Sequence, residues 1–202
     1  MLSDLLPIVD SVHLDIMDGE FVPPEAHSTE FIESFNPKVP KHIHVMAYDP
    51  GSYLDRLSTI ESFSFHIEAV EDPIPLLERI SLRGLSPGLV LNPETPVSRI
   101  KPYLGLVERV VLMAVKPGFS GQKYLSDTSR KLIELRKLAP DLPIVIDGGM
   151  HEDTIREVMT LGASSCVVCS VIVKASDPPQ KARELRESGL EGSDNREALF
   201  NE

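Results

Sequence analysis

Seven short apolar segments, rich in β-branched residues, recur along the chain. They are residues 12–17 (VHLDIM), 42–47 (HIHVMA), 63–69 (FSFHIEA), 88–92 (GLVLN), 109–115 (RVVLMAV), 143–148 (PIVIDG) and 164–170 (SSCVVCS). Runs of this length and composition, separated by polar or turn-forming residues, predict β-strands.

Segments with apolar residues three and four positions apart lie between these strands and predict helices. They are residues 52–60, 75–82, 126–138, 152–162 and 177–189. Ser126 is the clearest N-cap and Asp153 a weaker one, because their side chains can accept hydrogen bonds from the first backbone N–H groups of a helix. Gly84, Gly162 and Gly189 stand where helices are expected to end.

A strand followed by a helix, repeated along the chain, predicts a parallel sheet built from βαβ units. Seven strands are one fewer than in a (β/α)8 barrel, which usually needs about 250 residues, and this chain has 202. We therefore expect an α/β fold, a (β/α)8 TIM-type barrel lacking the first strand and most of the first helix. Residues 1–202 are expected to form a single domain, with residues 190–202 as an acidic surface tail.

The composition limits the possible partners. There are 31 acidic and 20 basic residues, giving a formal net charge of −11, so binding to nucleic acid or to an anionic membrane surface is not expected. An anionic small molecule remains compatible, because backbone N–H groups can hold it locally. No apolar run approaches about 18 residues, so we expect no membrane span.

Two cysteines, Cys166 and Cys169, form a CxxC pattern. The pattern lies in a strand-like run, and no second pair completes a cysteine-rich zinc site. We interpret both as structural. Without a disulfide framework or a signal-peptide profile at the N-terminus, we expect a cytoplasmic protein.

The stretch HLDIMDG at residues 13–19 places polar groups in a predicted strand. Side chains alternate between the two faces of a strand, so His13, Asp15 and Met17 share one face while Leu14 and Ile16 share the other. Buried charge is costly unless it is paired or binds a metal. A solvated strand end is the alternative explanation.

In a (β/α)8 barrel the active site lies at the carboxyl ends of the strands. The second predicted strand carries His42, His44 and Met46 on one face, the fifth carries Met113, and the sixth ends at Asp147. Two imidazoles and two carboxylates at one barrel mouth suit a divalent transition metal ion. A single histidine such as His42 or His66 is more typical of a packed or hydrogen-bonded side chain.

Two glycine-containing loops follow predicted strands directly, PGFSGQ at 117–122 and DGG at 147–149. Such turns expose backbone N–H groups that can bind a phosphate. Together with SVIVKAS after the last strand, they fit the phosphate site that many barrels carry beside their last strands.

The blocks HLDIMDGEFVP, HVMAYDP, FHIEA, LNPETP, LMAVKPGFSGQKY, VIDGG and CSVIVKASDP resemble, in order, those of the ribulose-phosphate 3-epimerase family. The resemblance implies a barrel that interconverts D-ribulose 5-phosphate and D-xylulose 5-phosphate through an enediolate. It also implies one divalent ion (zinc, iron(II), manganese or cobalt), a phosphorylated ketose as substrate, and a homo-oligomer.

The resemblance assigns roles residue by residue. His13, Asp15, His44 and Asp147 match the metal ligands, and Asp15 and Asp147 also match the two acid/base residues. The remaining substrate-binding positions, besides the two histidines, are Met17, Met46, Met113, Gly118, Phe119, Ser120, Gly121, Gly148, Gly149 and Ser170.

The chain also departs from the family pattern. Glu20 and Pro24 lie in the segment that is usually HFVPN, Ser120 replaces a glycine, Lys116 replaces an acidic or amide residue, and Cys169 replaces a glycine. Two alternatives therefore stay open. One is an epimerase of allulose 6-phosphate, because the altered loops could admit a longer sugar. The other is a truncated, weakly active paralogue that binds sugar phosphate.

Overall fold

A computed structural model describes the backbone of residues 2–200 and the side chains of residues 2–195. Its strands form one sheet in the order β2-β1-β3-β4-β5-β6-β7-β8. The bounds are β1 (Val12–Asp18), β2 (Glu25–Ala26), β3 (Lys41–Met46), β4 (Ser62–His66), β5 (Ser86–Leu91), β6 (Arg109–Met113), β7 (Ile144–Asp147) and β8 (Ser165–Val167). All pairs are parallel except β1 with the short β2, so the seven predicted strands are confirmed.

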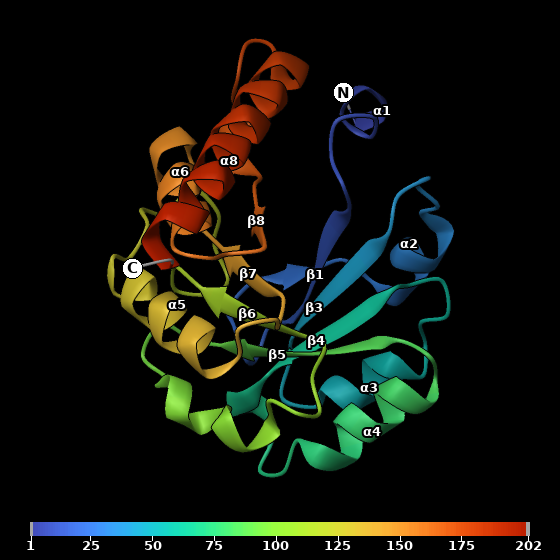
Figure 1. Ribbon diagram of the computed structural model, residues 1–202. Coiled ribbons are helices and arrows are strands. Elements are labelled where there is room, and N and C mark those ends of the chain that lie inside the picture. The colour runs from blue at the N-terminus through green and yellow to red at the C-terminus, as the bar shows by residue number, and fades with distance from the viewer. Residues whose placement is uncertain (1, 201–202) are drawn as a thin grey trace.

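Helices cover the outer face of this curled sheet (Figure 1). They are α1 (Leu2–Leu5), α2 (Thr29–Ser34), α3 (Pro50–Leu54), α4 (Ile74–Leu82), α5 (Asp127–Leu138), α6 (Glu152–Thr160), α7 (Ser170–Val173) and α8 (Pro178–Phe200). Three short 3-10 turns, at Ile67–Ala69, Val97–Arg99 and Lys101–Tyr103, complete the connections. Among the described residues, no helix has the length and apolar character needed to cross a bilayer.

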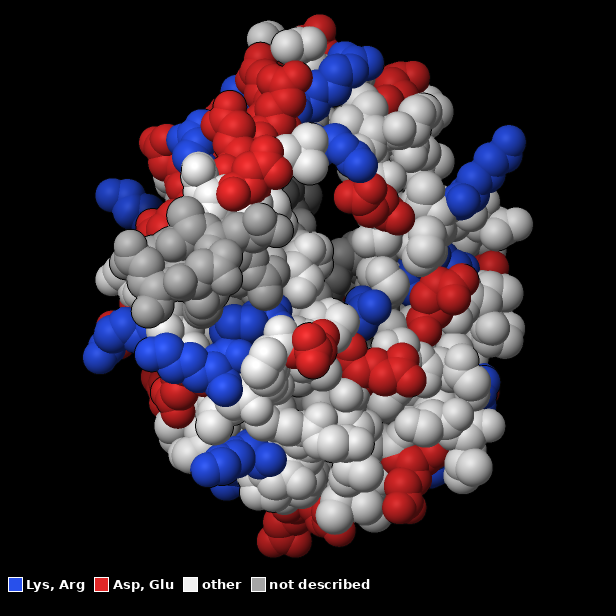
Figure 2. All heavy atoms as spheres, in the orientation of Figure 1, with Lys and Arg blue, Asp and Glu red and all other residues white. Residues whose placement is uncertain are grey.

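The barrel is open along one side. Within the described part of the chain, β8 pairs only with β7, and β1 pairs with β3 and, at its carboxyl end, with β2. Among residues 2–200, no backbone ladder joins β8 to β1. In Figure 2 a hollow enters the molecule on this side, between α8 and the N-terminal segment. The expected α/β barrel with one strand missing is therefore the observed architecture.

Two apolar layers follow from the alternation of side chains along the strands. The larger layer lies between sheet and helices and contains Leu14, Ile16, Ile43 and Val45 with most other buried apolar residues. A small second cluster lies on the other face of the strands: Val90, Val111, Met113, Val115 and Val145, with Val167 against it. His13 and Asp15 alternate with Leu14 and Ile16, so the polar face of β1 is turned away from the larger layer.

Several predicted elements end earlier than expected. The helix predicted over 52–60 is only α3, because the chain turns after Leu54. The strand predicted over 63–69 ends at His66 and continues as a 3-10 turn. The segment 164–170 is a strand only to Val167, and Ser170 begins α7.

The predicted helix boundaries are partly right. Gly84 and Gly162 follow α4 and α6 with φ of 72° and 104°, the left-handed backbone that glycine adopts at helix ends. Ser126 precedes α5, but its side chain accepts no capping hydrogen bond from the helix. Asp153 is not an N-cap, because α6 begins one residue earlier, after His151.

The helix end predicted at Gly189 is wrong. Helix α8 continues through Gly189 to Phe200, so residues 190–200 are helical, and residues 201–202 of the expected tail lie outside the described part. A second glycine in this helix, Gly192, allows close packing. A Cβ on Gly192 would lie 2.5 Å from the carbonyl oxygen of Arg156, so only a glycine lets α8 approach α6 this closely.

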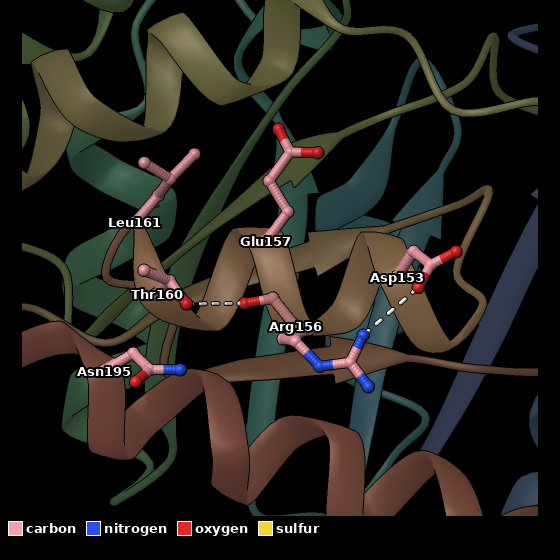
Figure 3. A pocket seen from close by; sticks show the side chains of 6 residues that line it. All are labelled: Asp153, Arg156, Glu157, Thr160, Leu161 and Asn195. Carbon is pink, nitrogen blue, oxygen red and sulfur yellow. Dashed lines mark hydrogen bonds and ion pairs between the residues drawn. The ribbon is translucent and has the colours of Figure 1, made fainter.

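Figure 3 shows this contact from the groove beside it, where Arg156 and Thr160 on α6 lie opposite Asn195 on α8. The Thr160 hydroxyl donates to the Arg156 carbonyl at 2.8 Å and contacts the Gly192 carbonyl at 3.1 Å. Arg156 pairs with exposed Asp153 and Glu191. The groove is open and is lined by residues of α6, the residue after it and α8, with no residue from a strand, so we assign it a packing role.

Candidate metal centre and active site

Four side chains converge at the carboxyl ends of three strands. His13 and Asp15 come from β1, His44 from β3 and Asp147 from β7, and one potential ligand atom of each lies within 4.8 Å of the other three. The register of β1 and β3 places Asp15 directly opposite His44. Since β7 is five positions along the sheet from β1, only the curl of the sheet brings Asp147 to them.

The individual distances describe a compact cluster. Asp15 Oδ1 lies 3.2 Å from His13 Nε2 and 3.2 Å from His44 Nδ1. Asp147 Oδ2 lies 3.7 Å from His13 Nε2 and 3.5 Å from His44 Nδ1. Each carboxylate oxygen therefore faces both imidazole nitrogens.

Three of these atoms, His13 Nε2, Asp15 Oδ1 and His44 Nδ1, are buried without a well-formed hydrogen bond. Buried polar atoms without partners are rare in folded proteins. Two imidazole nitrogens and two carboxylate oxygens are the ligands that zinc, iron(II) or manganese accept. The donor set and its unsatisfied atoms therefore fit a divalent ion.

The neighbouring groups in the cluster lower the pKa of Asp15 and raise that of His44. Burial alone would raise the pKa of Asp15, but hydrogen bonding and charge from His13 and His44 outweigh it and hold that pKa far below its usual range. Burial would lower the pKa of His44, but Asp147 and Asp15 raise it to about 9. Without an ion, the carboxylates thus retain a proton on His44, and a bound cation would replace it.

The three predicted methionines lie beside this cluster. Met17 and Met46 are opposite each other in the register of β1 and β3, and Met113 is opposite Asp147 in the register of β6 and β7. Met46 and Met113 are buried. Thioether side chains carry no charge and pack adaptably, so they supply an apolar wall next to the carboxylates.

The glycine loops have the backbone that the sequence predicts. Gly118, Gly121, Gly148 and Gly149 all have positive φ. A Cβ on Gly149 would lie 2.5 Å from the backbone nitrogen of Tyr124, so the DGG turn packs directly on the chain that follows the PGFSGQ loop. This contact holds the two loops together.

The PGFSGQ loop is held from within by Gln122. Its amide donates to the Lys116 and Phe119 carbonyls at 2.6 and 2.8 Å. Phe119 and Ser120 at the tip are exposed. The Lys174 amine lies near Gly121, 3.5 Å from where a Cβ would stand. Ser170 begins α7, after Cys169.

Asp18, the second carboxylate of HLDIMDG, has a structural role outside the cluster. Its Oδ1 accepts from the backbone N–H groups of Glu20 and Phe21 at 2.8 and 2.7 Å, and its Oδ2 accepts from that of Tyr48 at 3.0 Å. The side chain therefore ties the loop after β1 to the turn after β3, over the mouth of the barrel.

Sequence reasoning did not connect His66 and Glu68 to the site. His66 Nε2 lies 2.8 Å from His44 Nε2, and Glu68 Oε2 lies 3.3 Å from His66 Nδ1. The expectation that His66 and His42 are hydrogen-bonded histidines is correct, since His42 bonds Ser62 at 2.8 Å. The sequence signal that could have found His66 is its place on β4. With β4 paired to β3, His66 lies on the same face as His44, two residues beyond Ser64, the residue opposite His44.

Comparisons with known proteins agree with this arrangement. Residues 6–173 match the model of the ribulose-phosphate 3 epimerase family. The chain is 36% identical to the cytoplasmic isoform of ribulose-phosphate 3-epimerase from Oryza sativa, covering 93% of this chain and 85% of that protein. It is 33% identical to ribulose-phosphate 3-epimerase from Methanocaldococcus jannaschii, covering 91% and 81%.

Solved structures show the same fold at lower identity. The 3-hexulose-6-phosphate synthase of Salmonella typhimurium superposes with a TM-score of 0.73 at 16% identity, covering 95% of this chain and 91% of that one. Another 3-hexulose-6-phosphate synthase gives 0.69 at 18% identity, covering 92% and 90%. These structures show the fold. The family match and the two relatives show that the chain belongs to the ribulose-phosphate 3-epimerase family and is an isomerase, an epimerase acting on carbohydrates.

Proposed function

We propose that this chain is a metal-dependent 3-epimerase of a ketose phosphate, interconverting D-ribulose 5-phosphate and D-xylulose 5-phosphate. The observation that carries the proposal is the convergence of His13, Asp15, His44 and Asp147, with buried ligand atoms that lack partners. The names of the relatives, ribulose-phosphate 3-epimerase, support a ribulose phosphate as substrate and inversion at C3.

Epimerisation at C3 requires that one group removes a proton next to a carbonyl and that a second group delivers a proton to the opposite face. A bound divalent ion would supply Lewis-acid stabilisation of the negative charge that develops on the sugar oxygens. Asp15 and Asp147 are the acid/base pair in this proposal, one for each face of the planar enediolate. They suit that task because they come from β1 and β7, on opposite sides of the open seam.

The methionines and the loops complete the proposed site. Met17, Met46 and Met113 exclude water from the reacting carbon without offering it a proton. The backbone N–H groups of residues 118–121, 148–149 and 170 bind the phosphate, as exposed N–H groups of tight turns can. Lys174, beside Gly121, adds a positive charge at that end. The unpaired edges of β1 and β8 support association into a homo-oligomer, and the name of the rice relative supports a cytoplasmic location.

A coupled epimerase assay and a metal analysis of the same preparation test this function. We expect about one divalent ion per chain and turnover of D-ribulose 5-phosphate that is lost on chelation and restored by adding the ion. Faster turnover of a six-carbon ketose phosphate would transfer the assignment to the allulose 6-phosphate reaction. Bound sugar phosphate without turnover of either substrate would contradict an enzymatic role.

A further inference from the structure

Three side chains, His44, His66 and Glu68, form a line of hydrogen-bonding groups. It leads from the candidate metal centre past the end of β4 to the 3-10 turn that follows. His44 Nε2 faces His66 Nε2 at 2.8 Å, and His66 Nδ1 faces Glu68 Oε2 at 3.3 Å. Both imidazoles are fully buried, and their ring planes are inclined by 28°, with centroids 4.9 Å apart. The proposed reaction uses neither His66 nor Glu68.

The chemistry of these atoms fixes where the protons lie. An ionised carboxylate only accepts hydrogen bonds, so His66 Nδ1 carries a proton and donates to Glu68. A neutral imidazole has a single N–H, so His66 Nε2 presents a lone pair and accepts from His44 Nε2–H. The neutral form of His44 then has its lone pair on Nδ1, the atom that faces Asp15 and Asp147.

We propose that His66 and Glu68 are positioning residues that fix the tautomer and ring orientation of His44, so that its Nδ1 lone pair is directed at the metal ion. This inference rests on the proposed metal-dependent function. Hydrogen bonds behind a ligating histidine generally set its tautomer and raise its basicity as a ligand.

Neighbouring residues hold Glu68 and His66 in position. Glu68 Oε1 accepts from the Asn92 backbone N–H at 2.9 Å, and the Asn92 carbonyl accepts from Lys131 at 2.8 Å. The Phe21 ring lies over His66 with centroids 4.8 Å apart. Because Asp18 holds the backbone of Phe21, the loop after β1 also closes the site over His66.

Two substitutions of Glu68 distinguish an effect of its hydrogen bond to His66 from an effect of side-chain packing. Glu68→Met has a similar length but cannot accept from His66, whereas Glu68→Gln keeps an acceptor oxygen. Glu71→Met, at an exposed glutamate three residues further along, is the matched control. The readouts are zinc affinity by competition with a chelating dye, and long-range proton–nitrogen NMR correlations of the imidazoles in metal-free and zinc-loaded protein, assigned with a His66→Gln variant.

In the wild type we expect the His66 proton on Nδ1, with or without zinc. Glu68→Met should move it to Nε2 and weaken zinc binding about 10–100-fold. Glu68→Gln should weaken zinc binding less than Glu68→Met does. Glu71→Met should have the zinc affinity and the His66 proton position of the wild type. A wild-type His66 proton on Nε2, or unchanged zinc affinity in Glu68→Met, would overturn the inference. If the wild type binds no zinc, the proposed metal centre fails and the direction of Nδ1 towards an ion fails with it, while the position of the His66 proton still decides whether Glu68 sets the tautomer of His44.

Discussion

Asp15 and His44 are directly opposite each other on neighbouring parallel strands, and Oδ1 of Asp15 lies 3.2 Å from Nδ1 of His44. A shift of one residue between β1 and β3 would turn one of the two side chains to the outer, apolar face, because side chains alternate. The register of this strand pair therefore determines whether the candidate metal centre exists.

His44→Ala removes one of the four proposed ligands. We expect the metal content of the purified protein to fall well below that of the wild type, measured by elemental analysis. His42→Ala is the matched control, because His42 is on the same strand but bonds Ser62 outside the cluster. Equal metal content in His44→Ala and the wild type would exclude His44 as a ligand.

Asp147→Asn removes a proposed acid/base group and keeps its size. In metal-replete protein we expect turnover to fall by at least about 100-fold, the lower range for loss of a general acid or base. Asp153→Asn, at an exposed aspartate on α6, should retain wild-type turnover in the same coupled assay. Near wild-type turnover of a metal-replete Asp147→Asn would remove Asp147 from the mechanism.

Glu33 links α2 to the segment that follows α3. Its carboxylate accepts from the Ser58 backbone and hydroxyl at 2.8 and 2.6 Å, and from the Thr59 backbone at 3.1 Å. Burial would raise the pKa of Glu33, but these hydrogen bonds lower it to about 2. Its stabilisation is therefore present above about pH 4.5 and is lost as the pH falls towards 2.

We expect Glu33→Gln to lower the free energy of unfolding at pH 7 by about 1 kcal/mol, since solvent screens a partly exposed group. The difference from the wild type should shrink below pH 4.5. Urea unfolding followed between pH 7 and pH 3 measures it. A difference that stayed constant over this range would mean that the charge of Glu33 plays no part.

Gly189→Ala and Gly192→Ala, both in α8, should change the stability of the protein in opposite directions. A Cβ on Gly189 would be 3.5 Å from Ile155, an ordinary contact, so alanine should stabilise α8 by about 0.5–1 kcal/mol. A Cβ on Gly192 would be 2.5 Å from the Arg156 carbonyl, so alanine should destabilise by about 1–3 kcal/mol. Thermal unfolding of the two variants provides the comparison, and the same sign of change in both would contradict this account of the α6–α8 contact.

Closing the open side should strengthen both stability and substrate binding. Adding an N-terminal strand and helix of the family type would pair the free edges of β1 and β8 and fill the barrel interior. We expect a higher melting temperature and a lower Michaelis constant for the sugar phosphate. If the melting temperature and the Michaelis constant both stay unchanged, the open side of the barrel does not weaken stability or substrate binding, and this prediction is wrong.

Much of this architecture follows from periodicity in the sequence. All seven parallel strands were predictable because each is a compact apolar run, and α4, α5 and α6 because their apolar residues repeat at helical spacing. The two-residue β2 carries no such signal. Gly189 was misleading because glycine often ends a helix, whereas here α8 continues through it to Phe200.

The candidate site was predictable to a similar extent. His13, Asp15, His44 and Asp147 could be grouped because parallel strands bring their carboxyl ends to one mouth. The alternation of side chains along β1 separates Asp18 from Asp15, but it does not reveal what Asp18 does. Asp18 is the last residue of β1, and its partners are backbone N–H groups, which have no sequence signature. The line through His66 to Glu68 required the register between β3 and β4.

The open side of the barrel has a thermodynamic consequence for the candidate metal centre. His13 and Asp15 on β1 lie at one end of the sheet, and Asp147 on β7 lies next to its other end, yet His13 and Asp147 are only 3.7 Å apart. An ion coordinated there would cross-link the two ends of the sheet where no backbone ladder does. Separation of β1 from β8 and release of the ion would then be linked equilibria, and amide hydrogens on both edge strands should exchange more slowly in the metal-loaded protein than in the metal-free one.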